Sequence, residues 1–328
     1  MPSILPLVSI LTPSLNTGRY LKDTLRSISK QNYGNIEHIV VDGGSTDETL
    51  EILQSYSEVK WISRVEGPES TIAEAYREAF TMSCGKYIFQ CCISDGYLDQ
   101  EWISTCVDTL EANPDISLVY GLPQNMSEEG TFGRVAYHEF FDDPPPSGRD
   151  FLAFWLGTGF LFPEGNYCVR REVFDKCYFT NQSDDPFMKH SALGFVYGFV
   201  SAGYLPLFIP RIANFGRIHY SRQIWNRANE KPIDLLYSRM VKDYAKSLYS
   251  GQFQHHFRNG SSVTIGKIEP SDLSQLRRSI LRHRIARKKL FRRDLYTIYR
   301  KLCVRYPLLA RLIGRYHHQA IRQAPERF

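Results

Sequence analysis

Hydrophobic residues fall into short runs along the first part of the chain, and polar turns separate these runs. Apolar runs at residues 8–12 and 38–42 end in turns rich in Pro, Gly, Ser and Asn. Short runs of this kind between turn residues predict buried strands. The residues that follow each turn have helical spacing of apolar positions, which predicts helices at 19–30 and 46–56. The chain therefore begins as alternating strands and helices.

The alternation continues beyond these two units. The further predicted elements are strands at 60–64, 86–93 and 117–120 and helices at 71–82 and 100–112. After a less regular segment, the pattern predicts a strand at 167–171, helices at 172–176 and 184–203, and strand segments at 204–210 and 213–221. This order predicts an α/β fold, with a mostly parallel sheet that helices flank.

Polar residues gather where the first two strands end. Thr12, Pro13 and Asn16 lie at the end of the first strand, and Asp42 closes the second. The carboxyl ends of neighbouring parallel strands meet at one edge of a sheet, and ligands bind in the crevice outside that edge. These residues suit hydrogen bonding to a nucleobase and a ribose. A competing interpretation is that Asp42 only caps the turn at 43–45.

The chain has 328 residues, of which 43% are hydrophobic and 23% charged, enough for one large α/β domain and an appendage. Its seven cysteines show no metal-ligand or disulfide spacing. The first residues lack a basic leader with an apolar core, and no apolar run reaches the roughly 18–20 residues of a spanning helix. These features predict a cytoplasmic protein.

Charge is distributed unevenly along the chain. Residues 267–328 hold 17 Lys and Arg against 4 Asp and Glu, whereas residues 1–266 hold 23 against 31. We therefore expect a strand-and-helix domain at 1–225 and a basic helical extension at 226–328. A basic amphipathic helix suits an anionic membrane surface, here the inner face of the plasma membrane. Packing on the acidic body and pairing with a second copy are the alternatives, and no motif supports nucleic-acid binding.

Several segments resemble, in their order and spacing, the inverting family 2 glycosyltransferases of the GT-A fold. The likeness spans roughly residues 6–221 and rests on segments 8–16, 41–49, 61–64, 85–88, 94–95, 169–174 and 217–219. The resemblance implies a GT-A catalytic domain at 1–225 and a nucleotide-diphosphate sugar donor, namely a UDP-, dTDP- or GDP-sugar. It also implies transfer with inversion to a glycan or lipid-linked acceptor, in the synthesis of a cell-surface polysaccharide.

The resemblance assigns residues to the donor. Thr12 falls in the base pocket, and Asp42 reads the base, since a fixed carboxylate accepts a base N–H. Glu66 lies where the family often keeps an acidic residue near the base. Ser94 and Asp95 stand at the strand end that receives the donor diphosphate.

The family usually has two acidic residues at this strand end, which hold Mg²⁺ or Mn²⁺ on the diphosphate. This chain keeps Asp95 and has Gly96 in the second place. One carboxylate with phosphate oxygens and waters still suits Mg²⁺. The resemblance offers His219 as a ligand of the metal or diphosphate, against a purely structural role. Arg217 is the alternative partner of the diphosphate, because its guanidinium is permanently charged and can donate paired hydrogen bonds to phosphate oxygens.

Inverting transfer also needs a general base that takes the proton from the acceptor hydroxyl. The Asp that the family keeps at the start of a helix falls on Ala192 in this chain. The nearest carboxylates, Asp184 and Asp185, are our candidates for the base, and His190 is the other titratable neighbour. The two aspartates instead suit capping of the helix.

Two hypotheses about function follow. Asp95 and an intact base pocket favour a working transferase. Gly96 and Ala192 keep open a degenerate relative, which binds a nucleotide sugar or a partner enzyme without transferring. The irregular segment 121–165 is expected near the acceptor side of the cleft, and a homo-oligomer is compatible with either hypothesis.

Overall fold

The structure is a computed structural model of the chain. It describes residues 5–64, 72–135, 160–179 and 192–218, the single residues Phe151 and Trp155, and the stretches 254–256 and 262–264. The helices predicted for the basic extension lie outside the described residues, as does the first part of the helix predicted at 184–203. The division into 1–225 and 226–328 therefore stays a prediction.

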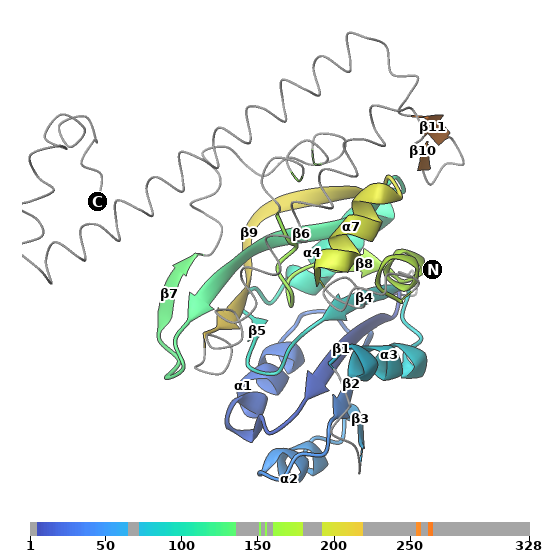
Figure 1. Cartoon of the computed structure of the whole chain (residues 1–328). Helices are drawn as coiled ribbons and strands as arrows, with labels where there is room; N and C mark the ends of the chain where they lie inside the picture. The colour runs from blue at the N-terminus through green and yellow to red at the C-terminus, as the bar shows by residue number, and fades with distance from the viewer. Residues whose placement is uncertain are drawn as a thin grey trace, which may run out of the picture.

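The first half of the main sheet is parallel, with its strands in the order β3-β2-β1-β4. The strands are β1 (Val8–Ser14), β2 (Ile36–Asp42), β3 (Val59–Ser63) and β4 (Tyr87–Gln90). The helices between them are α1 (Gly18–Ser29), α2 (Thr49–Gln54) and α3 (Ile72–Met82). α1 and α2 lie on one face of these strands and α3 lies on the other (Figure 1).

The second half of the sheet is mixed and continues from β4 in the order β8-β6-β9-β5. Its strands are β5 (Gly96–Tyr97), β6 (Ile116–Met126), β7 (Phe132–Val135), β8 (Cys168–Arg170) and β9 (Leu205–Arg217). β8 is antiparallel to β4 and β6, β6 is parallel to β9, and β5 and β7 are antiparallel to β9 and β6. The helices are α4 (Trp102–Ala112), α6 (Arg171–Phe174), which continues as the π-helical turn η2 (Asp175–Phe179), and α7 (Ala192–Ser201).

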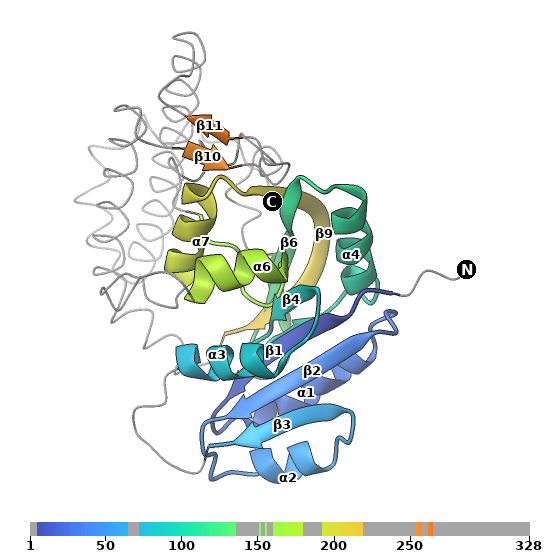
Figure 2. The same ribbon diagram turned by 90° about the vertical axis from the view of Figure 1, so that its right-hand side faces the viewer.

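Both faces of the sheet are covered by helices, α4 on one side and α6 with α7 on the other (Figure 2). Successive side chains of a strand point to opposite faces. Leu11, Ile39 and Val41 accordingly pack in the cluster that contains α3, α6 and α7. Ile10 and Val40 pack on the side of α1, α2 and α4. This two-sided burial explains the continuous apolar runs of the central strands.

Several predicted boundaries are wrong. The strands predicted at 117–120, 204–210 and 213–221 form two long strands, because β6 and β9 pair along almost their whole length and carry polar residues in the ladder. The strand predicted at 86–93 ends earlier, since β4 is paired with β1 only as far as Gln90. The helix predicted at 46–56 begins at Thr49, after a hydrogen-bonded turn.

Two smaller observations complete the fold. β10 (Gln254–His256) pairs with β11 (Ser262–Thr264) in a separate antiparallel ribbon. Within the part of the chain that the structure describes, no helix combines the length and the apolar character that crossing a bilayer requires.

Candidate functional site

Asp42 closes β2, and the residue is completely buried. Its Oδ2 accepts hydrogen bonds from the backbone N–H groups of Gly44 (3.0 Å) and Ser45 (2.9 Å) and from the Ser63 hydroxyl of β3 (2.9 Å). The Ser45 hydroxyl donates to Oδ1. Asp42 therefore holds the turn after β2 and fastens it to β3. This is the turn-capping role that the sequence left open, and contact with a base stays a prediction.

The turn beside Asp42 requires a glycine. Gly44 has a φ of 91°, in the left-handed region that side chains disfavour. A Cβ on Gly44 would lie 2.9 Å from the Arg64 carbonyl oxygen. The N–H of Arg64 in turn donates to the Asp42 carbonyl (2.9 Å). The Asp-Gly-Gly-Ser sequence thus lets the turn fold tightly against the end of β3.

Asn16 joins the end of β1 to the same turn. Its φ is 50°, a left-handed conformation that Asn adopts more readily than most residues. Its backbone N–H donates to the Ser45 hydroxyl (2.7 Å), and its Oδ1 accepts from the N–H of Thr46 (2.8 Å). The structure therefore brings Asn16 and Asp42 together through Ser45.

Asp47 serves the N-termini of two helices at once. Its Oδ1 accepts from the N–H of Thr49 in α2 (3.0 Å), and its Oδ2 accepts from the N–H of Gly18 in α1 (3.0 Å). Burial disfavours the charged carboxylate, but these hydrogen bonds outweigh burial and lower the pKa of Asp47. Asp47 therefore caps the first turns of both helices. The loops after β1 and β2 consequently form one hydrogen-bonded unit.

Thr12 lies in the interior of the sheet. The residue is completely buried, and its hydroxyl is 2.8 Å from Nε2 of His38 on β2. Burial lowers the pKa of His38 to about 3, so this imidazole is neutral near pH 7. Pro13 is half-buried and Asn16 is exposed. Of the three residues that the sequence assigned to the end of β1, Pro13 and Asn16 are accessible, whereas the Thr12 hydroxyl is engaged inside the sheet.

Asp95 lies beyond the end of β4, after a strained residue. Ser94 has a φ of 99°, which is rare for a residue with a side chain. The Thr24 hydroxyl of α1 accepts from the N–H of Ser94 (3.3 Å) and donates to the Asp95 carbonyl (2.7 Å). The N–H of Arg217 donates to Asp95 Oδ1 (2.9 Å). α1 thus fixes the backbone of the turn and β9 fixes the Asp95 side chain, and the residue is 2% exposed.

Position 96 has no room for a side chain. Gly96 pairs with Phe215 between β5 and β9. A Cβ on Gly96 would lie 2.5 Å from Oγ of Ser27 and 2.7 Å from the Phe215 ring. Both separations are shorter than packed atoms allow. The second carboxylate of the family pattern is therefore missing, and neighbouring side chains fill its place.

The Arg217 guanidinium is enclosed by protein groups. It forms an ion pair with Asp23 (2.7 Å), in which the Arg217 side chain is 4% exposed and the Asp23 side chain 55%. Nε donates to the Ser94 carbonyl (3.3 Å), and Nη1 donates to the Glu128 carbonyl (3.1 Å). The guanidinium carbon also lies 4.9 Å from the centre of the Tyr20 ring. A donor diphosphate that used this charge would compete with Asp23.

The described residues provide Asp95 as a carboxylate for a divalent metal. One of its oxygens is engaged by the N–H of Arg217, and Gly96 contributes no side chain. Within the described ranges, no group of three or more His, Cys, Asp and Glu side chains is arranged to hold a metal. These residues fit a metal that the donor diphosphate carries and one carboxylate contacts, as is common for Mg²⁺. They do not fit a site built by the protein alone.

Other predicted site residues lie outside the described residues. These are Glu66, Asp184, Asp185, His190 and His219. The described part of the helix that follows them, α7, begins at Ala192, where the resemblance places the Asp of the family.

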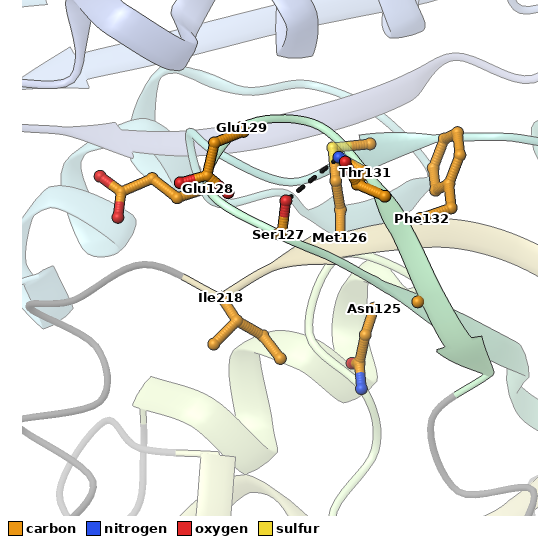
Figure 3. A pocket seen from close by; sticks show the side chains of 9 residues that line it. Asn125, Met126, Ser127, Glu128, Glu129, Thr131, Phe132 and Ile218 are labelled. Carbon is orange, nitrogen blue, oxygen red and sulfur yellow. Dashed lines mark hydrogen bonds between the residues drawn. The ribbon is translucent and has the colours of Figure 1, made fainter.

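A groove of about 550 Å³ opens beside the β6–β7 hairpin (Figure 3). Its lining comprises Asn125, Met126, Ser127, Glu128, Glu129, Thr131, Phe132, Gly133 and Ile218. Phe132 is 50% exposed and Ile218 41% exposed. The groove borders the Asp95 turn, because Ile218 follows Arg217 and the Glu128 carbonyl accepts from the Arg217 guanidinium. It falls in the segment that the sequence placed near an acceptor.

The sequence did not reveal the residues that fix these side chains. Ser63, Thr24 and Asp23 belong to ordinary strand and helix patterns, and only the folded sheet brings them to Asp42, Ser94 and Arg217. Glu164, another carboxylate at the end of β4, stands in an irregular segment. A single Glu between Pro and Gly forms no motif, so no sequence signal identified it.

The chain matches the family described as "Glycosyl transferase family 2" over residues 9–178. It is 32% identical over 137 residues to a chondroitin synthase of Escherichia coli, a match that covers 40% of this chain and 19% of that protein. It is 28% identical over 184 residues to the glycosyltransferase GlyG of Streptococcus pneumoniae, covering 53% of this chain and 60% of that protein. The chain thus spans only part of the length of these relatives.

Solved structures share the fold at low sequence identity. A fragment of S. aureus TarS superimposes with a TM-score of 0.55 at 14% identity, covering 84% of this chain and 71% of that one. The same fragment was also solved with UDP and with UDP-GlcNAc. The mannosyltransferase PcManGT from Pyrobaculum calidifontis, in complex with GDP-Man and Mn²⁺, gives a TM-score of 0.50 at 15% identity, covering 88% of this chain and 87% of that one.

Proposed function

The chain belongs to glycosyl transferase family 2, and we propose that it transfers a sugar from a nucleotide-diphosphate donor to a hydroxyl acceptor with inversion. Its fold is the GT-A fold that the sequence predicted. The observation that carries the proposal is the hydrogen-bonded unit of Asp42, Ser45 and Asn16 at the ends of β2 and β1. In the sheet, β1 lies between β2 and β4, and the Asp95 turn follows β4. A UDP-, dTDP- or GDP-sugar is the donor class in this proposal.

The donor would lie across the carboxyl ends of β2, β1 and β4. β1 separates β2 from β4, so a nucleoside near Asn16 and a diphosphate near Asp95 belong to one extended ligand. Asp42 Oδ1 accepts the Ser45 hydroxyl, and a carboxylate oxygen has capacity for a second hydrogen bond, such as a base N–H. Because Asp42 is completely buried, that contact requires the turn to open when the base binds. The bound UDP and GDP-Man in the related structures support this donor class.

The chemistry of the proposal is direct displacement at the anomeric carbon. Asp95 is the residue that would hold Mg²⁺ or Mn²⁺ on the diphosphate, and such a metal neutralises charge on the departing nucleoside diphosphate. Arg217 keeps a fixed positive charge beside the backbone of Ser94. The sequence offers Asp184 or Asp185 as the base and His219 as a further ligand, and Glu66 near the nucleobase.

The groove at the β6–β7 hairpin is the acceptor side in this proposal. Phe132 presents an exposed ring, on which the apolar face of a sugar packs. Asn125 and the Glu128–Glu129 pair supply polar groups for sugar hydroxyls. A glycan or lipid-linked acceptor fits this chemistry, and relatives such as the chondroitin synthases support a role in polysaccharide synthesis.

In this proposal, the basic extension determines where in the cell the enzyme acts. Its excess of Lys and Arg would hold a cytoplasmic enzyme on the inner face of the plasma membrane, where lipid-linked acceptors are made accessible. Docking on the acidic body or on a second copy are the rival roles of the extension.

A second candidate function rests on a specific observation. Phe215 and Ser27 fill the place of the second carboxylate at position 96, and α7 begins with Ala192. A chain with these two changes would bind a nucleotide sugar, or a partner enzyme, without transferring.

A donor screen distinguishes the two functions. The full chain is titrated by calorimetry with UDP-, dTDP- and GDP-sugars, with and without Mn²⁺ or Mg²⁺, and nucleotide release is followed in parallel. We expect one donor class to bind in a metal-assisted way and to release its nucleotide slowly by hydrolysis. Asp95→Asn should weaken binding of that donor at least about 10-fold, because one carboxylate contact is lost. Asp115→Asn, an exposed aspartate before β6, is the matched control.

The outcomes separate the hypotheses. Binding with nucleotide release in the wild-type chain, reduced in Asp95→Asn alone, supports the transferase. Binding without release would favour the non-catalytic relative. A folded chain that binds no donor would contradict the transferase and favour a non-catalytic relative that binds a partner enzyme.

A further inference from the structure

Glu164 is a half-buried carboxylate that lies where β4 ends. Because β8 runs antiparallel to β4, the residues before β8 lie at the carboxyl end of β4. Here Oε2 of Glu164 is 3.9 Å from Sγ of Cys92. The next residue, Gly165, packs against the Asp95 turn, since a Cβ built on it would lie 3.9 Å from Asp95 Cβ. Glu164 thus belongs to a segment that packs against the Asp95 turn.

The segment that carries Glu164 is held rigidly. The Tyr167 ring stacks on the Phe195 ring of α7, with centroids 5.3 Å apart and planes 10° apart. Asn214 of β9 donates to the Glu164 carbonyl (3.5 Å). These contacts hold the backbone that carries Glu164, and a group that takes a proton from a bound molecule needs such a fixed support.

The surroundings of Glu164 are rich in buried tyrosines, namely Tyr76, Tyr167 and Tyr178. Burial raises the pKa of Tyr167 and Tyr178, and the negative charge of Glu164 raises both further, which places the carboxylate close to these rings. The Glu164 carboxylate therefore borders a buried cluster of tyrosines.

Among the residues that the structure describes, three polar atoms beside this segment are buried and have no hydrogen-bond partner. They are Nε2 of Gln90, Nδ2 of Asn166 and Oδ1 of Asn214. Asn166 follows Gly165 directly, and the Cβ position of Gly165 is within 3.9 Å of both Gln90 and Asn214. Buried polar atoms left without partners are uncommon and mark places that a ligand or an ordered water completes. The wall around Glu164 thus has unused capacity for hydroxyl groups.

We propose that Glu164 is the general base of the transfer, in place of the residue missing at position 192. The inference rests on the proposed glycosyl transfer. As the acceptor oxygen forms its bond to the anomeric carbon, its proton passes to the Glu164 carboxylate. The bond from the anomeric carbon to the diphosphate breaks, and its electron pair leaves with the nucleoside diphosphate. The products are the glycoside, the nucleoside diphosphate and the proton held by Glu164.

The test compares a hydroxyl acceptor with one that has no proton to lose. Nucleotide release from the donor found in the screen is measured with water as the acceptor, and again with sodium azide. Glu164→Gln should lower release in water at least about 100-fold, the usual contribution of a general base. Azide should restore release and yield the glycosyl azide, because an anion needs no base. The donor affinity should be unchanged, and Glu58→Gln, an exposed glutamate, is the matched control.

A second variant keeps the proposal testable if Glu164→Gln alters the fold. Ala192 lies one helical turn before Phe195, whose ring stacks on Tyr167, so position 192 faces the same region. Ala192→Asp, combined with Glu164→Gln, should recover at least 10-fold of the lost release.

Each result has a distinct meaning. Loss in Glu164→Gln that azide repairs supports the inference. Unchanged release in Glu164→Gln overturns the inference and leaves the transferase in place. A wild-type chain that binds donors and releases no nucleotide with either acceptor overturns the proposed function and the inference with it.

Discussion

The two ends of the candidate site are built in different ways. At the end of β2, Asp42 is satisfied almost entirely by its own turn, through Gly44 and Ser45, with Ser63 added from β3. At the end of β4, Asp95 is fixed by Arg217, which lies 122 positions away in the chain. The first end is local in sequence, and the second depends on long-range packing.

The two ends also differ in how closely they keep the pattern of the family. The local turn retains the family pattern of Asp, Gly, Ser and Asp. The long-range end has Gly96 where the family has a carboxylate, and Phe215 of β9 occupies the vacated space. A side chain introduced at position 96 would therefore clash with Ser27 and Phe215. The comparison predicts that the two ends respond differently to substitution.

The largest expected effect is at Asp42. Asp42→Ala leaves two backbone N–H groups and two hydroxyls of a buried turn without their acceptor. We expect a loss of about 3 kcal/mol in the free energy of unfolding, since unsatisfied buried donors each carry a desolvation cost. Urea denaturation measures it. Asp115→Ala, at an exposed position, should change stability by less than about 0.5 kcal/mol. A loss below about 1 kcal/mol for Asp42→Ala would mean that the turn does not depend on it.

A smaller effect is expected at Gly96. Gly96→Asp places a Cβ against Ser27 and Phe215, and overpacking of this kind costs about 2 kcal/mol. The restored carboxylate should therefore not raise Mn²⁺-assisted donor affinity. Gly34→Asp is the matched control, because a Cβ on Gly34 meets nothing within 4 Å. Denaturation together with donor calorimetry checks this. A stable Gly96→Asp chain with tighter metal-assisted binding would show that the space is not filled.

The smallest expected effect concerns His38, which lies on β2, the strand that Asp42 closes. The pKa of His38 is about 3 in the folded chain, against 6.5 normally. Between these two pH values, His38 therefore binds a proton in the unfolded chain but not in the folded chain. Stability is therefore complete above pH 6.5 and falls as the pH drops toward 3. Between pH 7.5 and 5.5, this histidine should account for a loss of about 1.4 kcal/mol.

His38→Gln isolates this contribution. The variant keeps a polar partner for the Thr12 hydroxyl and has no group that titrates at this position. Above pH 5.5 the carboxylates remain ionised, so the difference in pH slope between the two chains reports on His38 alone. Equal slopes would indicate that the His38 imidazole is protonated in the folded chain over the same pH range as in the unfolded chain.

Much of the first half of the fold was predictable. The strands at β1, β2 and β3 and their helices follow from apolar runs and turn residues, because each strand is buried on both faces. The position of Asp42 at a strand end followed from the same local rules. The length of β6 and β9 was not predictable, since their polar residues are held by pairing with each other rather than by burial.

The sequence alone determined what depends on neighbours along the chain: the strand-turn-helix units of the first half, the family, and the strand end at Asp42. Tertiary structure decided what depends on distant residues. It set the enclosure of Arg217 by Asp23 and Glu128, the filling of position 96 by Phe215, and the approach of Glu164 to the Asp95 turn. The physical reason is that turns and caps are satisfied within a few residues, whereas sheet pairing and packing bring together side chains that no local pattern connects.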